Sequence, residues 1–162
     1  MFSPFNSLPA HSRVWVYQSE REFTSNEQLS ISEKIKTFLE NWTAHDKALK
    51  AGFEIRYNRF IILSIDEKQA AATGCSIDKS VHFIQKLEQE LNISLMNRML
   101  FAYKEGDKVK VSNRSEFEER IEKGLINSET IVFNNLVQSI ADMEMNWEVP
   151  LKNSWHKALL EI

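Results

Sequence analysis

The sequence predicts an α+β protein with a ferredoxin-like β-α-β-β-α-β antiparallel sheet and its helices on one face. Two observations lead to this fold class. Segments rich in β-branched and aromatic residues alternate with two long segments of helical periodicity, in that order through residue 104. The composition, with 43% hydrophobic and 27% charged residues, is that of a soluble globular protein.

A length of 162 residues suits one domain with a real core and is short for two. We therefore expect a single α+β domain over 1–162. Its parts are an N-terminal arm over 1–12, the β-α-β-β-α-β core over 13–104, and a hairpin and helix extension over 105–162.

The first half of the core is predicted from caps and periodicity. Arg13–Gln18 is β-branched and aromatic and predicts a strand. Thr24, Ser25 and Asn26 are candidate N-caps of a helix that runs to about Trp42. The apolar residues expected on its buried side are Leu29, Ile31, Ile35, Phe38, Leu39 and Trp42.

The second half of the core begins with Phe53–Tyr57, which alternates apolar and polar residues as a half-buried strand does. A turn at Asn58-Arg59 leads to Phe60–Ile65, a more uniformly apolar and therefore central strand. A second helix is expected from about Ser76 to about Asn92. Its inner side would carry Ile77, Val81, Ile84, Leu87 and Leu91.

The extension is expected to hold shorter elements. Leu100–Lys104 is the fourth strand of the core, and with Lys108–Val111 it forms a hairpin across Glu105-Gly106-Asp107. Asn113–Lys123 predicts a charged helix that ends at Gly124. Thr130–Val137 is an apolar strand that would break at Asn134-Asn135, and the tail from Trp147 holds a short helix with Trp155 and His156.

The predicted topology brings several polar side chains to one end of the sheet. The loop before the second helix holds Gly74, Cys75 and Ser76, and it should lie beside Trp42-Thr43-Ala44-His45 and near His11. A helix start exposes unpaired backbone N–H groups and favours a thiolate or a bound anion. In this interpretation Cys75 is the nucleophile and His45 the base, while Ser76 caps the helix and Asp78 suits its dipole. Gly74, Ser76, Asp78, His11 and Trp42 would line the ligand site.

Each of these residues also has a purely structural interpretation. A lone cysteine is more often a small buried hydrophobe than a nucleophile. Gly74 would then only permit a turn, Asp78 would be a favourable first-turn charge, and His45 a surface residue near a helix end. His82, one turn into the second helix, is expected to be solvated or to pack, and His156 has no partner suggested by the sequence.

Charge and motifs exclude several classes of partner. Twenty basic and twenty-three acidic residues give a net charge of −3, so no global field favours nucleic acid or an acidic membrane surface. The longest apolar run, Phe60–Leu63, is far shorter than a membrane span. With one cysteine and no secretory signal in Met1–Asn6, we expect a cytoplasmic protein.

Metal and nucleotide motifs are missing from the sequence. There is no HExxH, no CxxC and no histidine pair four residues apart, so no metal or cofactor is expected, and His11, His45 and Cys75 could bind a metal only by converging in space. The glycines at 52, 74, 106 and 124 form neither a Walker loop nor GxGxxG.

The sequence also resembles a known family. The segments that carry the resemblance are His11–Gln18, Trp42–His45, Asn58–Phe60, Gly74–Asp78, Val132–Val137 and Trp147–His156. Together they look like a family of short uncharacterised bacterial proteins often labelled ABC transporter ATPase. That label implies ATP hydrolysis, but a phosphate-binding loop and an LSGGQ-like signature are both missing here.

Two functions from different classes follow. The first is a Cys/His site that binds a small anionic or carbonyl ligand and carries out thiol-dependent transfer or hydrolysis. The second is a non-catalytic interaction module, whose charged third helix and aromatic tail would bind a partner chain or a second copy in a homodimer.

Overall fold

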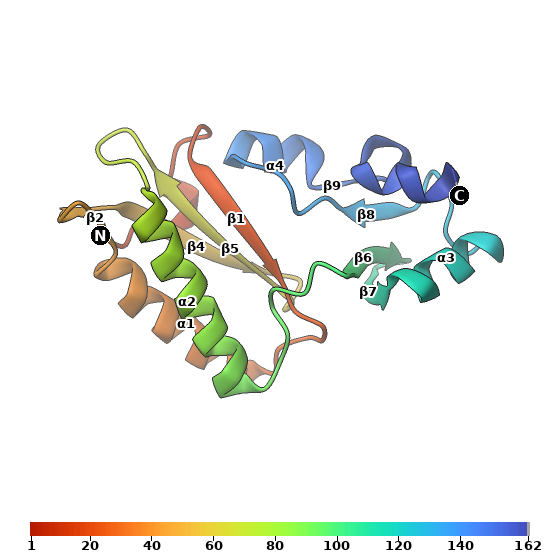
Figure 1. Cartoon of the computed structure of the whole chain (residues 1–162), viewed down its shortest axis with the longest axis horizontal. Coiled ribbons are helices and arrows are strands. Elements are labelled where there is room, and N and C mark those ends of the chain that lie inside the picture. The colour runs from red at the N-terminus through yellow and green to blue at the C-terminus, as the bar shows by residue number, and fades with distance from the viewer. Residues whose placement is uncertain (162) are drawn as a thin grey trace. The chain divides into compact units, whose positions relative to one another are not determined.

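The computed structural model describes residues 1–161, and they divide into two compact units. The first unit comprises Met1–Met96 with Gln138–Ala141, and the second comprises Asn97–Val137 and the chain from Asp142 onward. Both contain helices and antiparallel strands, so the α+β class is confirmed (Figure 1). A single domain over 1–162 stays a prediction.

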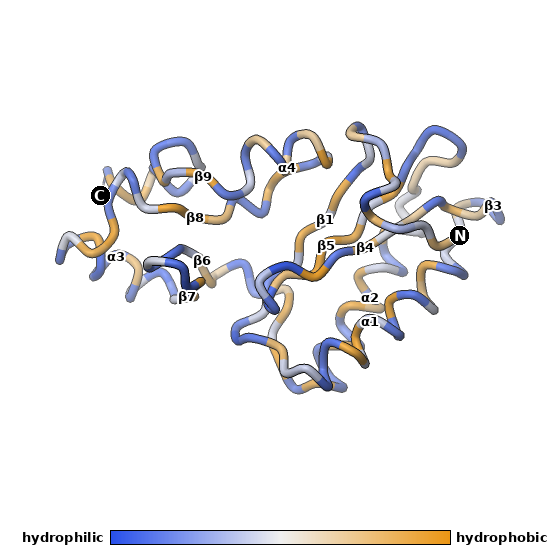
Figure 2. Tube along the Cα trace, turned by 180° about the vertical axis from the view of Figure 1, so that it is seen from behind, coloured by the Kyte–Doolittle hydropathy of each residue, from blue (hydrophilic) through white to orange (hydrophobic). Residues whose placement is uncertain are grey.

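The first unit is built on a three-stranded antiparallel sheet. Its strands are β1 (Arg13–Gln18), β4 (Lys50–Arg56) and β5 (Phe60–Asp66), in the order β1-β5-β4. Every residue of β5 is buried, as its uniformly apolar sequence predicts, and β5 is hydrophobic over much of its length in Figure 2. The N-terminal arm forms a short 3₁₀ turn, η1 (Phe5–Ser7), and pairs with the edge of β4 through Ser3 N–H and Ala51 O.

Two helices, α1 (Ser25–Glu40) and α2 (Gly74–Leu91), pack on one face of this sheet (Figure 1). A core of fully buried side chains lies between them and β5, namely Ile31, Ile35, Leu39, Ile84, Leu87, Ile61, Leu63 and Ile65. Thr24 caps α1 through a reciprocal capping box with Glu27, so the predicted start of this helix is confirmed.

The predicted buried sides of both helices need correction. Leu29 is 68% exposed, because it lies about 200° around the helix from Ile31 at 3.6 residues per turn. In α2 the buried line runs through Ser76, Ser80, Ile84 and Leu87. The expected inner residues Ile77, Val81 and Leu91 are therefore only half-buried.

The fourth strand of the expected core lies in a different sheet. β6 (Leu100–Glu105) pairs with β7 and β8 of the second unit, so the four-stranded ferredoxin-like topology is not confirmed. Irregular chain borders the outer edge of β1 instead. Val14 N–H donates to Gln138 O over 3.1 Å, and Gln18 N–H donates to Leu95 O over 3.2 Å.

A short hairpin between α1 and β4 was not predicted. It joins β2 (Thr43–Ala44) to β3 (Lys47–Ala48), and its two turn residues, His45 and Asp46, have φ of 50° and 64°. Two residues a strand give no detectable alternation in sequence, which explains the omission.

The second unit holds the sheet β7-β6-β8-β9, formed with β7 (Lys108–Asn113), β8 (Ile131–Phe133) and β9 (Glu148–Pro150). The predicted β6–β7 hairpin is confirmed, and β8 ends before Asn134-Asn135 as expected. The helices α3 (Arg114–Glu122) and α4 (Ile140–Asn146) and the 3₁₀ turns η2 (Leu151–Asn153) and η3 (Trp155–Glu161) complete the chain. Asn113 caps α3 by accepting from Glu116 N–H.

His156 is part of the core of the second unit. Its ring is 1% exposed, stacks on Trp155 at 3.8 Å and meets Phe101 edge-on at 5.7 Å. Its Nδ1 lies 2.7 Å from Ser154 Oγ. Burial lowers the pKa of this imidazole to about 4, so the neutral form is the one that packs.

Candidate functional site

The start of α2 is closed by its own side chains. Thr73 is the N-cap, and its hydroxyl accepts from Ser76 N–H over 3.2 Å while Ser76 Oγ accepts from Thr73 N–H over 2.7 Å. Ser76 is therefore the third residue of a capping box and not the cap that the sequence suggested. It is 1% exposed, whereas Gly74, Cys75 and Asp78 are exposed.

Trp42 connects the end of α1 to the start of α2. Its indole N–H donates to Ser76 O over 2.8 Å, and the side chain is 2% exposed. The hydrogen bond brings together two of the residues expected in the ligand site. It also uses the only polar atom of the indole, so Trp42 offers only carbon surface to other groups.

Neither candidate histidine forms a hydrogen bond with the start of α2 in the described residues. His45 is exposed in the β2–β3 turn. His11 Nε2 lies 3.2 Å from Asp66 Oδ1 at the end of β5. A backbone hydrogen bond from Lys68, followed by the contact with His11, lowers the pKa of Asp66. Over residues 1–161 no hydrogen bond joins Cys75 to a histidine, and the thiol and base pair stays a prediction.

A groove of about 590 Å³ lies between α1 and α2. Ligand pockets in proteins commonly have volumes of this order. Residues 33–42 of the α1 segment and 79–90 of α2 line it, with Trp42 at one end and the Lys34–Glu90 ion pair at the other. The groove thus shares Trp42 with the site expected from the sequence.

Aromatic rings line the interior of the groove. Phe38 and Phe83 stack at 4.5 Å with 12° between their planes, and Phe38 meets Trp42 at 5.1 Å. Phe38 and Phe83 are only half-buried, so part of each ring remains available at the groove. Below them, Leu87 is 1% exposed and belongs to the core.

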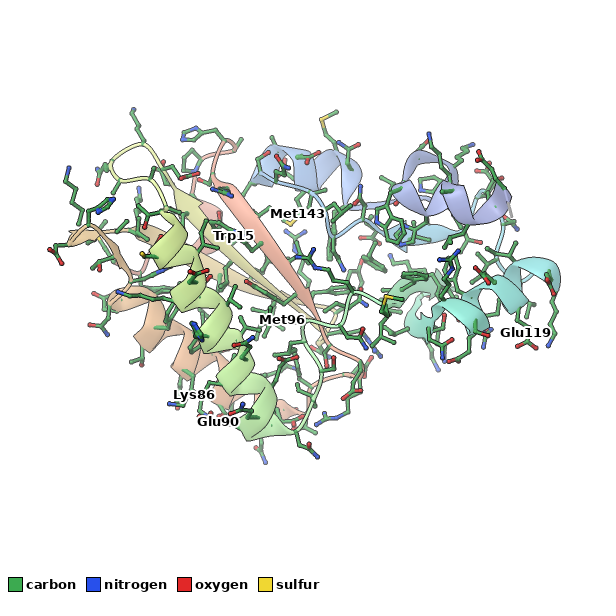
Figure 3. The ribbon with its side chains drawn as sticks, in the orientation of Figure 1. Trp15, Lys86, Glu90, Met96, Glu119 and Met143 are labelled. Atoms are coloured by element: carbon green, nitrogen blue, oxygen red, sulfur yellow. The ribbon has the colours of Figure 1, made fainter. Side chains whose placement is uncertain are left out.

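The charges on the rim differ between the two ends. At one end Lys34 Nζ donates to Glu90 over 2.5 Å, and Lys86 lies 4.0 Å from the same carboxylate; Lys86 and Glu90 project from α2 in Figure 3. The hydrogen bond from Lys34 lowers the pKa of Glu90. Lys79, toward the Trp42 end, is exposed and makes no ion pair with any residue in 1–161. A cation without an anion therefore borders the aromatic part of the groove.

Sequence reasoning did not identify Lys79, Phe38 or Phe83 as site residues. Phe38 was assigned to the buried stripe, because an aromatic residue at helical spacing usually belongs to the core. Lys79 and Phe83 are four residues apart and so share one side of α2. That spacing is a signal, but it is common on solvated helices and does not single out a site.

In the described residues no group of three or more histidine, cysteine, aspartate or glutamate side chains is placed to hold a metal ion. None of the helices formed by residues 1–161 is both long and apolar enough to cross a bilayer.

Comparisons of the chain with protein-family models, with curated proteins and with solved structures found no match. The family resemblance noted from the sequence therefore stays a prediction.

Proposed function

We propose that this protein binds a small anionic ligand in the groove between α1 and α2. One observation carries the proposal: the groove combines half-buried aromatic rings with the unpaired cation of Lys79. An apolar concave surface with a few convergent polar groups is the usual form of a small-molecule site. The ligand class agrees with the small anionic ligand expected from the sequence.

Titration with anilinonaphthalene sulfonate, followed by its fluorescence, tests this proposal. This probe carries an anion on an apolar ring system, and we expect saturable binding to the folded protein. Lys79→Glu should weaken binding at least about fivefold, which corresponds to about 1 kcal/mol for an exposed ion pair. Lys157→Glu makes the same change of charge at an exposed lysine of the second unit and should leave binding unchanged. Equal affinities for the two variants would refute the site.

Thiol-dependent chemistry is a second candidate, favoured by the exposure of Cys75. Cys75 lies four residues before Lys79, on the same side of α2 and one turn from the groove. In this proposal the ligand is an ester, and the Cys75 sulfur attacks its carbonyl carbon while His45 accepts the thiol proton. The carbon–oxygen bond of the ester then breaks, and His45 returns the proton to the departing alcohol. Water hydrolyses the thioester to the free acid and regenerates the Cys75 thiol. Ser76 and Asp78 would shape that helix start, and Gly74 would leave it open.

The pH dependence of Cys75 alkylation by iodoacetamide separates the two candidates. A thiol activated by the fold should react in the folded protein at a lower pH than in the urea-unfolded chain. Identical pH profiles in the two states would remove the thiol chemistry and leave the binding function in place. Cys75→Ser controls for labelling elsewhere.

The interaction module is the alternative to both. The charged side chains of α3 offer less to a partner chain than the sequence suggested, because Arg114 pairs with Glu118 and Lys123 pairs with Glu119 within the helix. Trp155, 40% exposed in the tail, is the residue that we propose would meet a second copy. Sedimentation at increasing concentration tests a homodimer, and a monomer at all concentrations would exclude it.

We also propose that the first unit is a ferredoxin-like sheet without its fourth strand, since β1, α1, β4, β5 and α2 follow that order. A cytoplasmic location remains part of the proposal, because a free exposed thiol suits a reducing compartment. ATP hydrolysis is not proposed, because the sequence holds no phosphate-binding loop.

A further inference from the structure

The two ends of the groove differ in their side chains, and this difference restricts the ligand that can bind. We infer that the ligand is a planar aromatic acid, whose ring packs on Phe38 and Phe83 and whose carboxylate pairs with Lys79. This inference rests on the binding function proposed above and names the ligand class of the same site.

The ring position follows from the aromatic side chains. Phe38 and Phe83 form a nearly parallel stack, and Trp42 lies tilted by 39° against Phe38. A flat ring that enters the groove would extend this cluster. Aromatic pairs are favoured over aliphatic contacts of equal area by about two- to tenfold in an equilibrium constant. The indole N–H of Trp42 already donates to Ser76 O, so it is not available to the ligand. The ligand ring therefore needs no polar atom to pair with this aromatic cluster.

The carboxylate position follows from the charges. At the end of the groove formed by the first half of α1 and the last turns of α2, Lys34 and Lys86 already face the carboxylate of Glu90. Glu33 adds a second negative charge there. Within residues 1–161 this end therefore offers no unpaired cation to an anion. Lys79 lies toward the opposite end and has no anionic partner among the described residues. The ligand should therefore bind with its anion toward Lys79.

The length of the ligand follows from the helix geometry. Lys79 and Phe83 are separated by four residues, which is about 6 Å along the axis of α2. An acid whose carboxylate is joined to the ring by one or two carbons suits this spacing of the two positions, because the flexible lysine side chain can adjust to the carboxylate. A long unbranched chain would leave the flat aromatic surfaces incompletely covered.

A matched pair of acids tests the ligand class. Naphthylacetate and its fully hydrogenated analogue, decahydronaphthylacetate, share a carboxylate and a carbon skeleton but differ in aromaticity. We expect calorimetric titration to give at least about twofold tighter binding for naphthylacetate. Phe83→Leu, which keeps an apolar side chain, should remove that preference, and Phe38→Leu is a second variant in case the first does not fold. Lys79→Gln should weaken both acids by the same factor.

The outcomes distinguish this inference from the proposed function. Equal affinities for the two acids would overturn the inference that the ligand is an aromatic acid and leave the groove as an anion site. The same conclusion would follow if anilinonaphthalene sulfonate binds and neither acid does. If neither acid nor the sulfonate binds, both proposals are wrong. A preference for naphthylacetate that persists in Phe83→Leu and Phe38→Leu would place the ring elsewhere and overturn the inference.

Discussion

Acid should destabilise this protein through His156, a buried residue of the second unit. The imidazole is 1% exposed and its pKa is lowered from 6.5 to about 4 by burial. Between these pH values the unfolded chain binds a proton that the folded chain does not. The contribution of His156 is therefore complete above about pH 6.5 and is lost as pH falls toward 4.

The size of the effect follows from the pKa difference. Since each pKa unit corresponds to about 1.4 kcal/mol, the full loss is about 3 kcal/mol. That is a substantial part of the stability of an ordinary domain. The loss of stability from His156 should be separable from the loss caused by protonation of Glu27. The hydrogen bond from Arg21 is the chief cause that lowers the pKa of Glu27 to about 2, so this carboxylate takes up its proton at lower pH.

Urea unfolding across this pH interval, followed by circular dichroism, measures the effect. His156→Phe keeps a ring against Trp155 but cannot bind the proton, so its free energy of unfolding should fall less steeply with acid. The exposed His82, replaced by phenylalanine, is the matched control and should retain the wild-type slope. Parallel slopes for wild type and His156→Phe would refute the reasoning.

Four further substitutions have expected effects on stability, each measured as the free energy of unfolding. Gly52→Ala should cost at least about 1 kcal/mol, because a Cβ there would lie 2.5 Å from Ser3 O. In Gly74→Ala the added Cβ meets nothing within 4 Å, so this change should stabilise α2 by up to about 1 kcal/mol. Changes of the same sign in the free energy of unfolding of both variants would contradict this reasoning. Glu27→Gln should cost about 1 kcal/mol near neutral pH by loosening the α1 cap, and the difference should vanish as pH falls from 4.5 toward 2; a constant difference would argue against the carboxylate. Ser64→Ala should be neutral or stabilising by about 1 kcal/mol, because this buried hydroxyl has no hydrogen-bond partner in residues 1–161, and a clear loss of stability would reveal an unrecognised role.

The predicted elements were those with strong local signals. β1, β5 and the β6–β7 hairpin followed from β-branched runs and a turn glycine, and the start of α1 followed from its capping residues. The pairing of β6 was not predictable in this way. A strand of suitable composition can join either of two sheets, and only long-range packing decides which one it joins.

The candidate site was predictable only in part. The predicted topology correctly placed Trp42 beside Ser76, because that adjacency depends only on β1, β4, β5 and the two helices α1 and α2. It also predicted that His45 would lie close to Cys75, and this part stays a prediction. No hydrogen bond joins the two residues in the described part of the chain, and His45 lies in a two-residue turn with positive φ that the sequence did not predict. The groove was missed because each of its aromatic residues is also explained by core packing.

The most direct test of the binding site is chemical-shift mapping of the amide resonances during titration with anilinonaphthalene sulfonate. A ligand in the groove should shift amides within 33–42 and 79–90, and Lys79→Glu should reduce these shifts at equal ligand concentration. Shifts confined to the second unit, or shifts at α1 and α2 that do not depend on Lys79, would contradict the account.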